Sequence, residues 1–341
     1  MSRIRIAVDA AGGDHGPSNV VAGTLLAARH LNFDVVLIGS GDSIERECRR
    51  QRVSTGTNVK IVSTPDVITM NEGPSALRRK PKASVRLAAE TVALGDADAF
   101  FSAGNTGATL VAAHSTFGML PGVDRPALAT RIPTLLNDAV LLDIGATVAC
   151  RASNLLQFGL MGATYAKAVI GVKRPRVGLL SIGEEEVKGN DLTRDAHGLL
   201  KASGLRFTGN VEARDLYSGE TDVVVCDGFT GNIALKVSEG LVEVVERLLH
   251  DELRRTFTTK LGYLLSRRSF RRFKRRVDYS EYGGAPLLGV DGLAVVGHGC
   301  SSVRAVFNAL MLTQRFVRQG LVTMIRKDLP ADVKSGGESR R

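Results

Sequence analysis

The sequence predicts an α/β protein built on a mostly parallel, doubly wound sheet. Short apolar runs alternate with longer stretches of helical periodicity, and a glycine-rich turn follows several of the apolar runs. This alternation is typical of parallel sheets with helical connections. The composition agrees, because 44% hydrophobic residues and 37 glycines suit a globular enzyme and not a disordered chain. Sheets of this kind bind ligands at the carboxyl ends of their strands.

The individual elements follow from the same patterns. The expected strands lie at residues 4–8, 34–38, 59–62, 97–101, 127–132, 139–144, 176–182, 222–226 and 293–296. The expected helices lie at residues 20–31, 83–94, 109–120, 155–169 and 301–321, with a further long helix from Ile233. Ser18 or Asn19 is expected to cap the first of these helices.

Residues 1–325 are expected to form a single α/β catalytic domain. Within it, residues 70–82 break the alternation and predict a surface loop or lid, whose basic residues are either solvated or in contact with substrate. Residues 250–278 predict a projecting basic helical hairpin, because ten Lys or Arg and no Asp or Glu lie between Arg254 and Arg276. Residues 326–341 are expected to be a disordered tail.

The formal net charge of +10 predicts an anionic partner, either a nucleic acid, an anionic membrane, an acidic protein or a phosphorylated substrate. The lack of tryptophan argues against a stacking surface for single-stranded nucleic acid. The four cysteines are widely spaced, so reduced thiols in a cytoplasmic protein are expected, with no metal and no other cofactor. Neither a signal peptide nor an apolar run of roughly 18 residues, enough to span a bilayer, is expected.

The turn at residues 102–108 is the first candidate for an anion site. It follows an apolar strand and precedes a helix, so free backbone N–H groups at the helix start would face an anion. Its glycines and neutral donors are Ser102, Gly104, Asn105, Thr106 and Gly107. The simpler interpretation, a plain turn with a threonine cap, fits the heptad equally well.

Similar turns follow other expected strands. In the first of them, His15 is a general base, a phosphate donor or a helix cap, and it follows Gly13 and Asp14. In a later turn, Lys188 precedes Gly189 and Asn190. A lysine there can neutralise a phosphate or a developing oxyanion, or it can pair with a neighbouring glutamate.

Two further turns complete the set. Asp227 and Asn232 lie after the strand at 222–226, where Asn232 is an anion donor or a cap. Cys300 near His298 suggests a nucleophile, although side chains so close on an extended chain need not meet. Several anion-binding turns without an obvious nucleophile favour an enzyme that holds phosphate itself as the nucleophile, with positioning and oxyanion stabilisation supplying the rate.

Six motifs occur in an order that is specific even though each motif is common: residues 7–14, 102–108, 182–190, 227–232, 279–289 and 298–299. Over residues 3–325 they closely resemble the bacterial phosphate acyltransferase family of phospholipid synthesis, the acyl-[acyl carrier protein]:phosphate transacylases. The resemblance implies a homodimer and a Rossmann-like three-layer sandwich, as in the isocitrate/isopropylmalate dehydrogenases and phosphotransacetylase. The family usually has methionine, asparagine, aspartate, proline and serine where this chain has Ala11, Thr147, Ala149, Ala152 and Cys300.

The implied reaction transfers a fatty acyl group from acyl carrier protein to inorganic phosphate, giving an acyl phosphate for glycerol-3-phosphate acylation. The expected catalytic residues are Lys188, Asn105, His15 and Asn232. The expected substrate-binding residues are Gly13, Asp14, Ser102, Gly104, Thr106, Gly107, Gly189, Asn190 and Asp227. The alternatives are a short-chain phosphotransacetylase that uses coenzyme A, and a basic protein that binds membrane or nucleic acid. The ordered motifs disfavour the latter, so no nucleic-acid partner is expected.

The basic segment at 250–278 suits an anionic membrane surface. Its expected contacts with lipid, or with the acidic carrier protein, are Leu261, Leu264, Leu265, Arg267, Arg268, Arg271 and Arg272. Alternatively, its apolar faces pack on each other or on a dimer partner. The resemblance implies a cytoplasmic protein, peripherally associated with the inner face of the cell membrane. There a membrane-bound glycerol-3-phosphate acyltransferase would consume the product.

Overall fold

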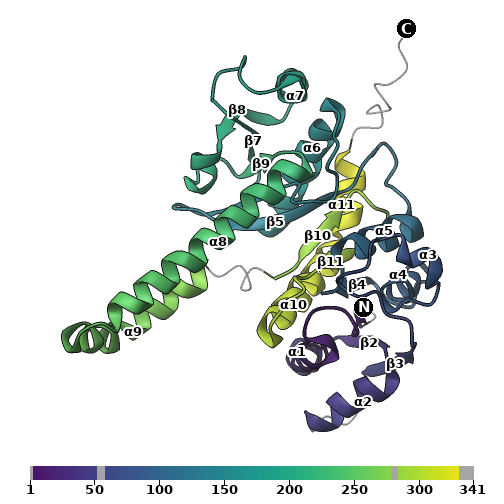
Figure 1. Ribbon diagram of the computed structural model, residues 1–341. Coiled ribbons are helices and arrows are strands. Elements are labelled where there is room, and N and C mark those ends of the chain that lie inside the picture. Colours follow the sequence, from purple (N-terminus) through teal and green to yellow (C-terminus); the bar gives the residue numbers. More distant parts are fainter. Residues whose placement is uncertain (1–2, 52–57, 278–282, 330–341) are drawn as a thin grey trace.

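The computed structural model describes residues 3–51, 58–277 and 283–329. One eleven-stranded sheet, in the order β3-β2-β1-β4-β11-β10-β5-β6-β9-β7-β8, runs through the molecule (Figure 1). Its strands are β1 (Arg5–Asp9), β2 (Asp34–Gly39), β3 (Val59–Ser63), β4 (Ala99–Ser102), β5 (Ala127–Pro133), β6 (Asp138–Leu142), β7 (Arg176–Ser181), β8 (Arg206–Glu212), β9 (Val223–Val225), β10 (Ala285–Leu288) and β11 (Ala294–Val296). The prediction of a mixed α/β fold is confirmed.

Two parallel blocks make up most of this sheet. The first block comprises β3, β2, β1, β4 and β11, and the second comprises β6, β9, β7 and β8. Three antiparallel pairings lie between the blocks, namely β11 with β10, β10 with β5 and β5 with β6. Three reversals make the strands of the second block run opposite to those of the first. Their carboxyl ends therefore lie at opposite edges of the sheet.

Helices cover the sheet because its strands bury both faces. In β1, Ile6 and Val8 belong to one buried cluster, whereas Ala7, which points the other way, belongs to a second. The first cluster lies under α1 (Gly16–Leu31), α6 (Ala152–Val169) and α10 (Val303–Gln319). The second lies under α4 (Ser84–Ala93) and α5 (Thr106–Phe117).

Several boundaries differ from the expected ones. Helix α1 begins at Gly16, with Pro17 in its first turn, so the expected caps Ser18 and Asn19 lie inside it. Helix α5 begins at Thr106 because the Asn105 side chain caps it. The expected helix at 301–321 is α10 followed by α11 (Leu321–Asp328), so the expected disordered tail does not begin at 326. Residues 330–341 lie outside the described residues.

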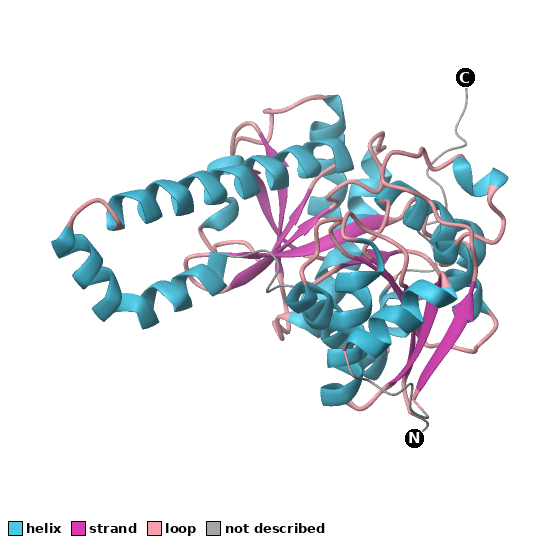
Figure 2. Ribbon diagram, turned by 60° about the horizontal axis from the view of Figure 1, so that its bottom comes forward, coloured by secondary structure: helices cyan, strands magenta, loops and turns pink. Residues whose placement is uncertain are grey.

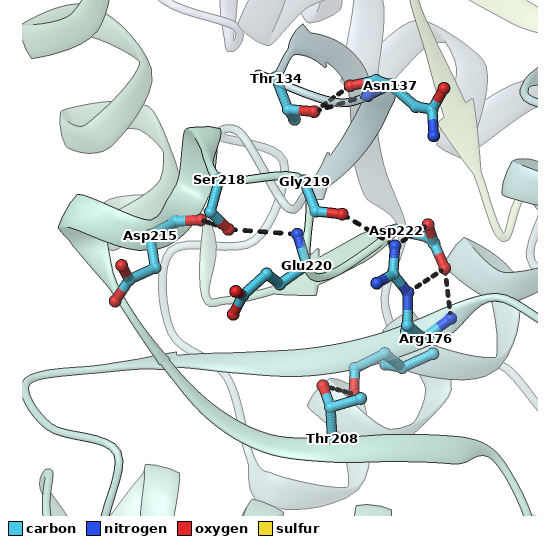
Figure 3. A network of polar contacts seen from close by, with 10 residues as sticks. Thr134, Asn137, Arg176, Thr208, Asp215, Ser218, Gly219, Glu220 and Asp222 are labelled. Atoms are coloured by element: carbon cyan, nitrogen blue, oxygen red, sulfur yellow. Dashed lines mark hydrogen bonds and ion pairs between the residues drawn. The ribbon is translucent and has the colours of Figure 1, made fainter.

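The sequence did not predict the segment between β7 and β9 in detail. It contains α7 (Asp191–Ala202), β8 and the short helix η1 (Ala213–Tyr217). Two further short helices, α2 (Gly41–Arg50) and α3 (Ala76–Arg79), lie earlier in the chain. The Arg176 side chain closes this region. Its guanidinium contacts both carboxylate oxygens of Asp222, at 3.0 and 2.8 Å, and donates to the carbonyl of Gly219 at 2.8 Å (Figure 3). This fork fixes the start of β7 to the approach to β9.

Two long helices, α8 (Gly228–Leu253) and α9 (Phe257–Val277), extend side by side away from the sheet (Figures 1 and 2). Lys274 of α9 pairs with Glu246 of α8 at 3.0 Å, and Arg276 donates to the carbonyl of Thr134 at 2.8 Å. No residue of α9 is buried. No helix within the described ranges is both long and apolar enough to cross a membrane.

Candidate active site

Three turns of the first block meet at the carboxyl ends of β1, β4 and β11. Gly12 and Gly104 touch, because a Cβ added to Gly12 would lie 2.7 Å from the Gly104 backbone. The N–H of Asp14 donates to the carbonyl of Gly299 at 2.8 Å, and Gly13 adopts φ +95° beside the same carbonyl. Only glycine permits this approach, so the predicted glycines bring the three turns together.

Ser102 links these turns to β1 through two hydrogen bonds of its side chain. It is fully buried, its hydroxyl donates to Asp9 at 2.7 Å, and it accepts from the N–H of Gly104 at 3.1 Å. Burial raises the pKa of the Asp9 carboxyl above its usual value. The Ser102 hydroxyl therefore holds the turn in shape, and its hydrogen-bonding capacity is used inside the protein.

Asn105 joins the turn to the segment at 69–80. Its Oδ1 accepts from the N–H of Ala108 at 2.9 Å, and its Nδ2 donates to the carbonyl of Glu72 at 2.8 Å. The Glu72 carboxylate pairs with Lys80 at 2.8 Å, and this hydrogen bond lowers the pKa of Glu72 to about 2. The expected loop or lid is thus fastened to the helix that follows β4.

In the second block, Asp143 organises the turn after β6. Its carboxylate accepts from the N–H groups of Leu128, Gly145, Ala146 and Thr147, at 2.9, 3.0, 2.9 and 2.6 Å. Burial nevertheless raises its pKa to about 6. A Cβ at Gly145 would lie 3.8 Å from the Asn232 side chain, so the turn presents its open backbone to the first turns of α8.

Lys188 lies in the turn after β7. Its N–H donates to the carbonyl of Glu185 at 3.0 Å, and its side chain is exposed. Within the part of the chain that is described, the ammonium has no ion pair with Glu184 or Glu185, which was the alternative interpretation. Because β7 and β9 are neighbours and parallel, Lys188 and Asn232 follow adjacent strands at one edge of the sheet.

Helix α8 brings the two blocks together. Asn232, Lys236 and Glu239 share one face of it at spacings of four and three residues, and Glu239 Oε1 lies 3.6 Å from Nε2 of His298 in the turn after β11. Asn232 and Glu239 are separated by roughly 10 Å along the helix. Burial lowers the pKa of His298, against the opposing effect of Glu239. Lys236 and Glu239 were not among the predicted site residues, although both lie at helical spacing from Asn232 in the sequence.

The predicted polar site residues fall into two groups. In the first, each side chain has a structural partner inside the protein: Ser102, Asn105, Asn190 and Asp227. In the second, no side-chain hydrogen bond or ion pair occurs to any described residue: Asp14, His15, Thr106, Lys188 and Asn232. The second group is available to a ligand. No cluster of three or more His, Cys, Asp or Glu side chains suited to a metal ion occurs among the residues described.

Known proteins match the chain along almost its whole length. The model of the family "Fatty acid synthesis protein" matches residues 4–324. A phosphate acyltransferase of Acidobacterium capsulatum is 47% identical over 97% of this chain and 98% of its own length. A phosphate acyltransferase of Heliobacterium modesticaldum is 44% identical over 97% and 99%. The chain belongs to the phosphate acyltransferase family. The resemblance seen in the motifs is confirmed, and the protein is an acyltransferase.

Solved structures agree on the fold of this phosphate acyltransferase family member. A phosphotransacetylase from Streptococcus pyogenes superposes with a TM-score of 0.64 at 13% identity, covering 93% of this chain and 94% of its own. A branched-chain phosphotransacylase from Enterococcus faecalis gives 0.54 at 15% identity, covering 92% and 99%. At these identities the likeness concerns the fold alone.

Proposed function

We propose that the protein transfers a fatty acyl group from acyl carrier protein to inorganic phosphate, giving an acyl phosphate for glycerol-3-phosphate acylation. Lys188 and Asn232 carry this proposal. Both side chains lack a partner among the described residues, and they follow neighbouring parallel strands. A cation and a neutral donor so placed suit a phosphate. The net charge of +10 suits an acidic carrier protein.

In the proposed reaction a phosphate oxygen attacks the thioester carbonyl carbon and forms the new C–O bond. Lys188 and backbone N–H groups stabilise the tetrahedral oxyanion. The oxyanion then collapses, the C–S bond breaks, and the carrier thiolate leaves and takes up a proton. In this proposal the carrier approaches from the side of Asp14 and His15, whose side chains after β1 have no hydrogen bond or ion pair to a described residue.

Residues 1–325 act as one catalytic unit in this proposal, within a Rossmann-like three-layer sandwich that forms a homodimer. An apolar stripe on α8 supports the dimer: Ile233, Val237, Leu241, Val244 and Leu248 are exposed and recur at helical spacing. This stripe occupies a different face of α8 from Asn232, Lys236 and Glu239. A second copy can therefore cover it without blocking the site.

Helix α9 is the proposed contact with the anionic membrane surface. Leu261, Leu264 and Leu265 are exposed, and the neighbouring arginines at 267, 268, 271 and 272 supply positive charge. Each basic residue near lipid headgroups contributes about 1 kcal/mol. The protein would then lie peripherally on the inner face of the membrane, near a membrane-bound acyltransferase that consumes the product.

The experiment that tests the function is replacement of Lys188. In Lys188→Ala, kcat for acyl phosphate formation should fall by about 100-fold or more, because one oxyanion donor is lost. The matched control is Lys201→Ala, since Lys201 pairs with Glu186 in the same region and should be dispensable. Normal turnover by a folded Lys188→Ala protein would contradict the assigned role.

The alternative enzyme is a phosphotransacetylase acting on a short-chain acyl-coenzyme A; the phosphotransacetylase from Streptococcus pyogenes shares the fold. Palmitoyl-carrier protein and acetyl-coenzyme A should be compared as acyl donors at equal phosphate. Preference for the palmitoyl carrier supports the proposal, whereas preference for acetyl-coenzyme A supports the alternative.

A further inference from the structure

An open pocket of about 370 Å³, called the cavity below, lies between α5 and the segment that follows β6. Leu110 and Val111 of α5 form one wall, and Val148 and Ala149 form part of the other. The volume falls in the range of small-molecule sites, roughly 300–1,000 Å³. Walls of this composition favour an apolar occupant, because they offer it few hydrogen bonds and release water when it enters.

Two basic side chains, Arg125 and His114, border this largely apolar space. Arg125 lines the cavity and is exposed, and it forms no side-chain hydrogen bond or ion pair to any residue within the described ranges. Salt bridges engage other arginines of the body, such as Arg131 with Asp138 and Arg176 with Asp222. An arginine without such a carboxylate, next to an apolar wall, complements a ligand that is apolar along its length and anionic at one end.

A single turn of backbone, residues 145–147, separates the cavity from the candidate active site. Asp143 holds the backbone of residues 145–147 with three hydrogen bonds. On one side of this turn, Gly145 faces Asn232, and the carbonyl of Thr147 accepts from Gly228 at the start of α8. On the other side, residues 146–149 line the cavity. A ligand in the cavity therefore lies one turn of backbone away from Asn232.

From this geometry we infer that the cavity binds the alkyl part of a fatty acyl substrate, with Arg125 meeting an anionic group of the same ligand. The inference rests on the proposed function and adds to it a binding place for the chain. It predicts that the enzyme distinguishes long chains from short ones through α5 and residues 146–149. Binding and orientation of the chain need no new covalent step.

The test measures binding without turnover, by titration calorimetry with dodecyl phosphate and butyl phosphate as probes. The variant Ala149→Leu fills the cavity. It should lower the affinity for dodecyl phosphate by about tenfold, while the affinity for butyl phosphate stays within about twofold of wild type. Arg125→Gln should weaken both probes, since both carry the anion. Ser115→Leu is the matched control, because Ser115 is exposed on α5 and does not line the cavity.

Two results would overturn the inference: equal affinity of wild type and Ala149→Leu for dodecyl phosphate, or equal weakening of both probes. If Ala149→Leu does not fold, Val111→Phe repeats the test from the other wall, where the side chain is partly exposed. Activity assays separate this inference from the proposed function. A wild-type protein that forms no acyl phosphate from a palmitoyl carrier overturns the function. An active enzyme whose chain-length preference is the same in Ala149→Leu overturns only the cavity.

Discussion

Helices α6 and α8 follow strands of the same block, and both carry apolar residues at helical spacing, yet only α6 is covered. Most residues of α6 are buried, including Phe158 and Tyr165. In α8, which is longer, only Gly228 and Gly231 are buried. The difference arises because α6 packs on the sheet over its full length, whereas α8 leaves the sheet after its first turns (Figure 2). Apolar periodicity thus indicates a face to be covered, without saying whether the same chain covers it.

The largest difference should appear between two phenylalanines, one in each helix. Phe158→Ala in α6 should lower the free energy of unfolding by about 4 kcal/mol, since a fully buried ring leaves a cavity. Phe229→Ala in α8 should change it by less than about 0.5 kcal/mol, because that ring is 59% exposed. Urea unfolding of both variants tests the comparison, and equal losses would show that α8 is covered after all.

The second effect concerns the turn that leads from β6 to α6. Asp143→Ala should cost about 3 kcal/mol, because four backbone N–H groups lose their buried acceptor. The pKa of Asp143 is raised to about 6, so the folded state favours the protonated form. Its contribution to stability is therefore fully present below about pH 4 and declines as the pH rises through 6.

The pH dependence of the unfolding free energy shows directly whether the pKa of Asp143 is raised or lowered in the folded protein. The difference in unfolding free energy between wild type and Asp143→Ala should be larger at pH 4 than at pH 7, by at most about 3 kcal/mol. A difference that grows between pH 4 and pH 7 would mean that the hydrogen bonds outweigh burial, and that the carboxyl titrates below its usual pKa.

A smaller effect is expected at the start of α8. Asp227 accepts from the N–H groups of Phe229 and Thr230, at 3.0 and 2.9 Å, so Asp227→Ala should cost about 1 kcal/mol. Asp251→Ala, near the other end of the helix, serves as the control and should be close to neutral. Thermal unfolding monitored by circular dichroism distinguishes the two, and identical melting temperatures would argue against the cap.

The smallest change in protomer stability should come from the exposed stripe of α8. Replacing both Val237 and Leu241 with glutamate should change the unfolding free energy at low protein concentration by less than about 0.5 kcal/mol. The same variant should lose self-association in sedimentation velocity experiments. Association at the wild-type level would show that the dimer uses another surface. The stripe would then be a candidate contact with lipid.

The membrane contact is tested separately on α9. Replacing Leu261 and Leu264 with glutamate should abolish sedimentation with anionic liposomes, since the exposed leucines can no longer enter the headgroup layer. Soluble transacylase activity should stay within about twofold of wild type, because α9 has no buried residue. Joint loss of activity and dimer would place this face in the protein's own assembly.

The sequence predicted the parallel blocks well because most of their strands, such as β1, β2 and β4, are buried on both sides and consist of continuous apolar runs. It did not predict β8, where exposed and buried residues are mixed around Gly209. The sequence also did not predict the antiparallel pairings of β10 and β5 at the centre of the sheet. The periodicity of β5 gives no direction, β10 was not among the expected strands, and their pairing joins residues far apart in the chain.

Within the candidate site, the turns predicted from the sequence follow strands as expected, but the sequence did not show which contacts each side chain makes. Asn105 and Lys188 appeared equally suited to bind an anion, because both follow a strand in a glycine-containing turn. The structure separates them. Asn105 caps α5 and fastens Glu72, while Lys188 has no such partner in the described chain. That distinction depends on contacts between distant segments, such as the one between Asn105 and residues 69–72, which local patterns do not encode.

The position of β11 in the sheet also determines when, during translation, the strand β4 can pair on both sides. Strands β5 to β9 form one contiguous stretch, residues 127–225, and they pair with one another, although β5 also pairs with the later strand β10. Strand β4 pairs with β1 on one side but waits for Ala294–Val296 on the other. Until those residues are translated, one edge of β4 keeps its N–H and C=O groups unpaired. During most of its synthesis, the nascent chain therefore presents an open edge that a chaperone would have to shield from aggregation.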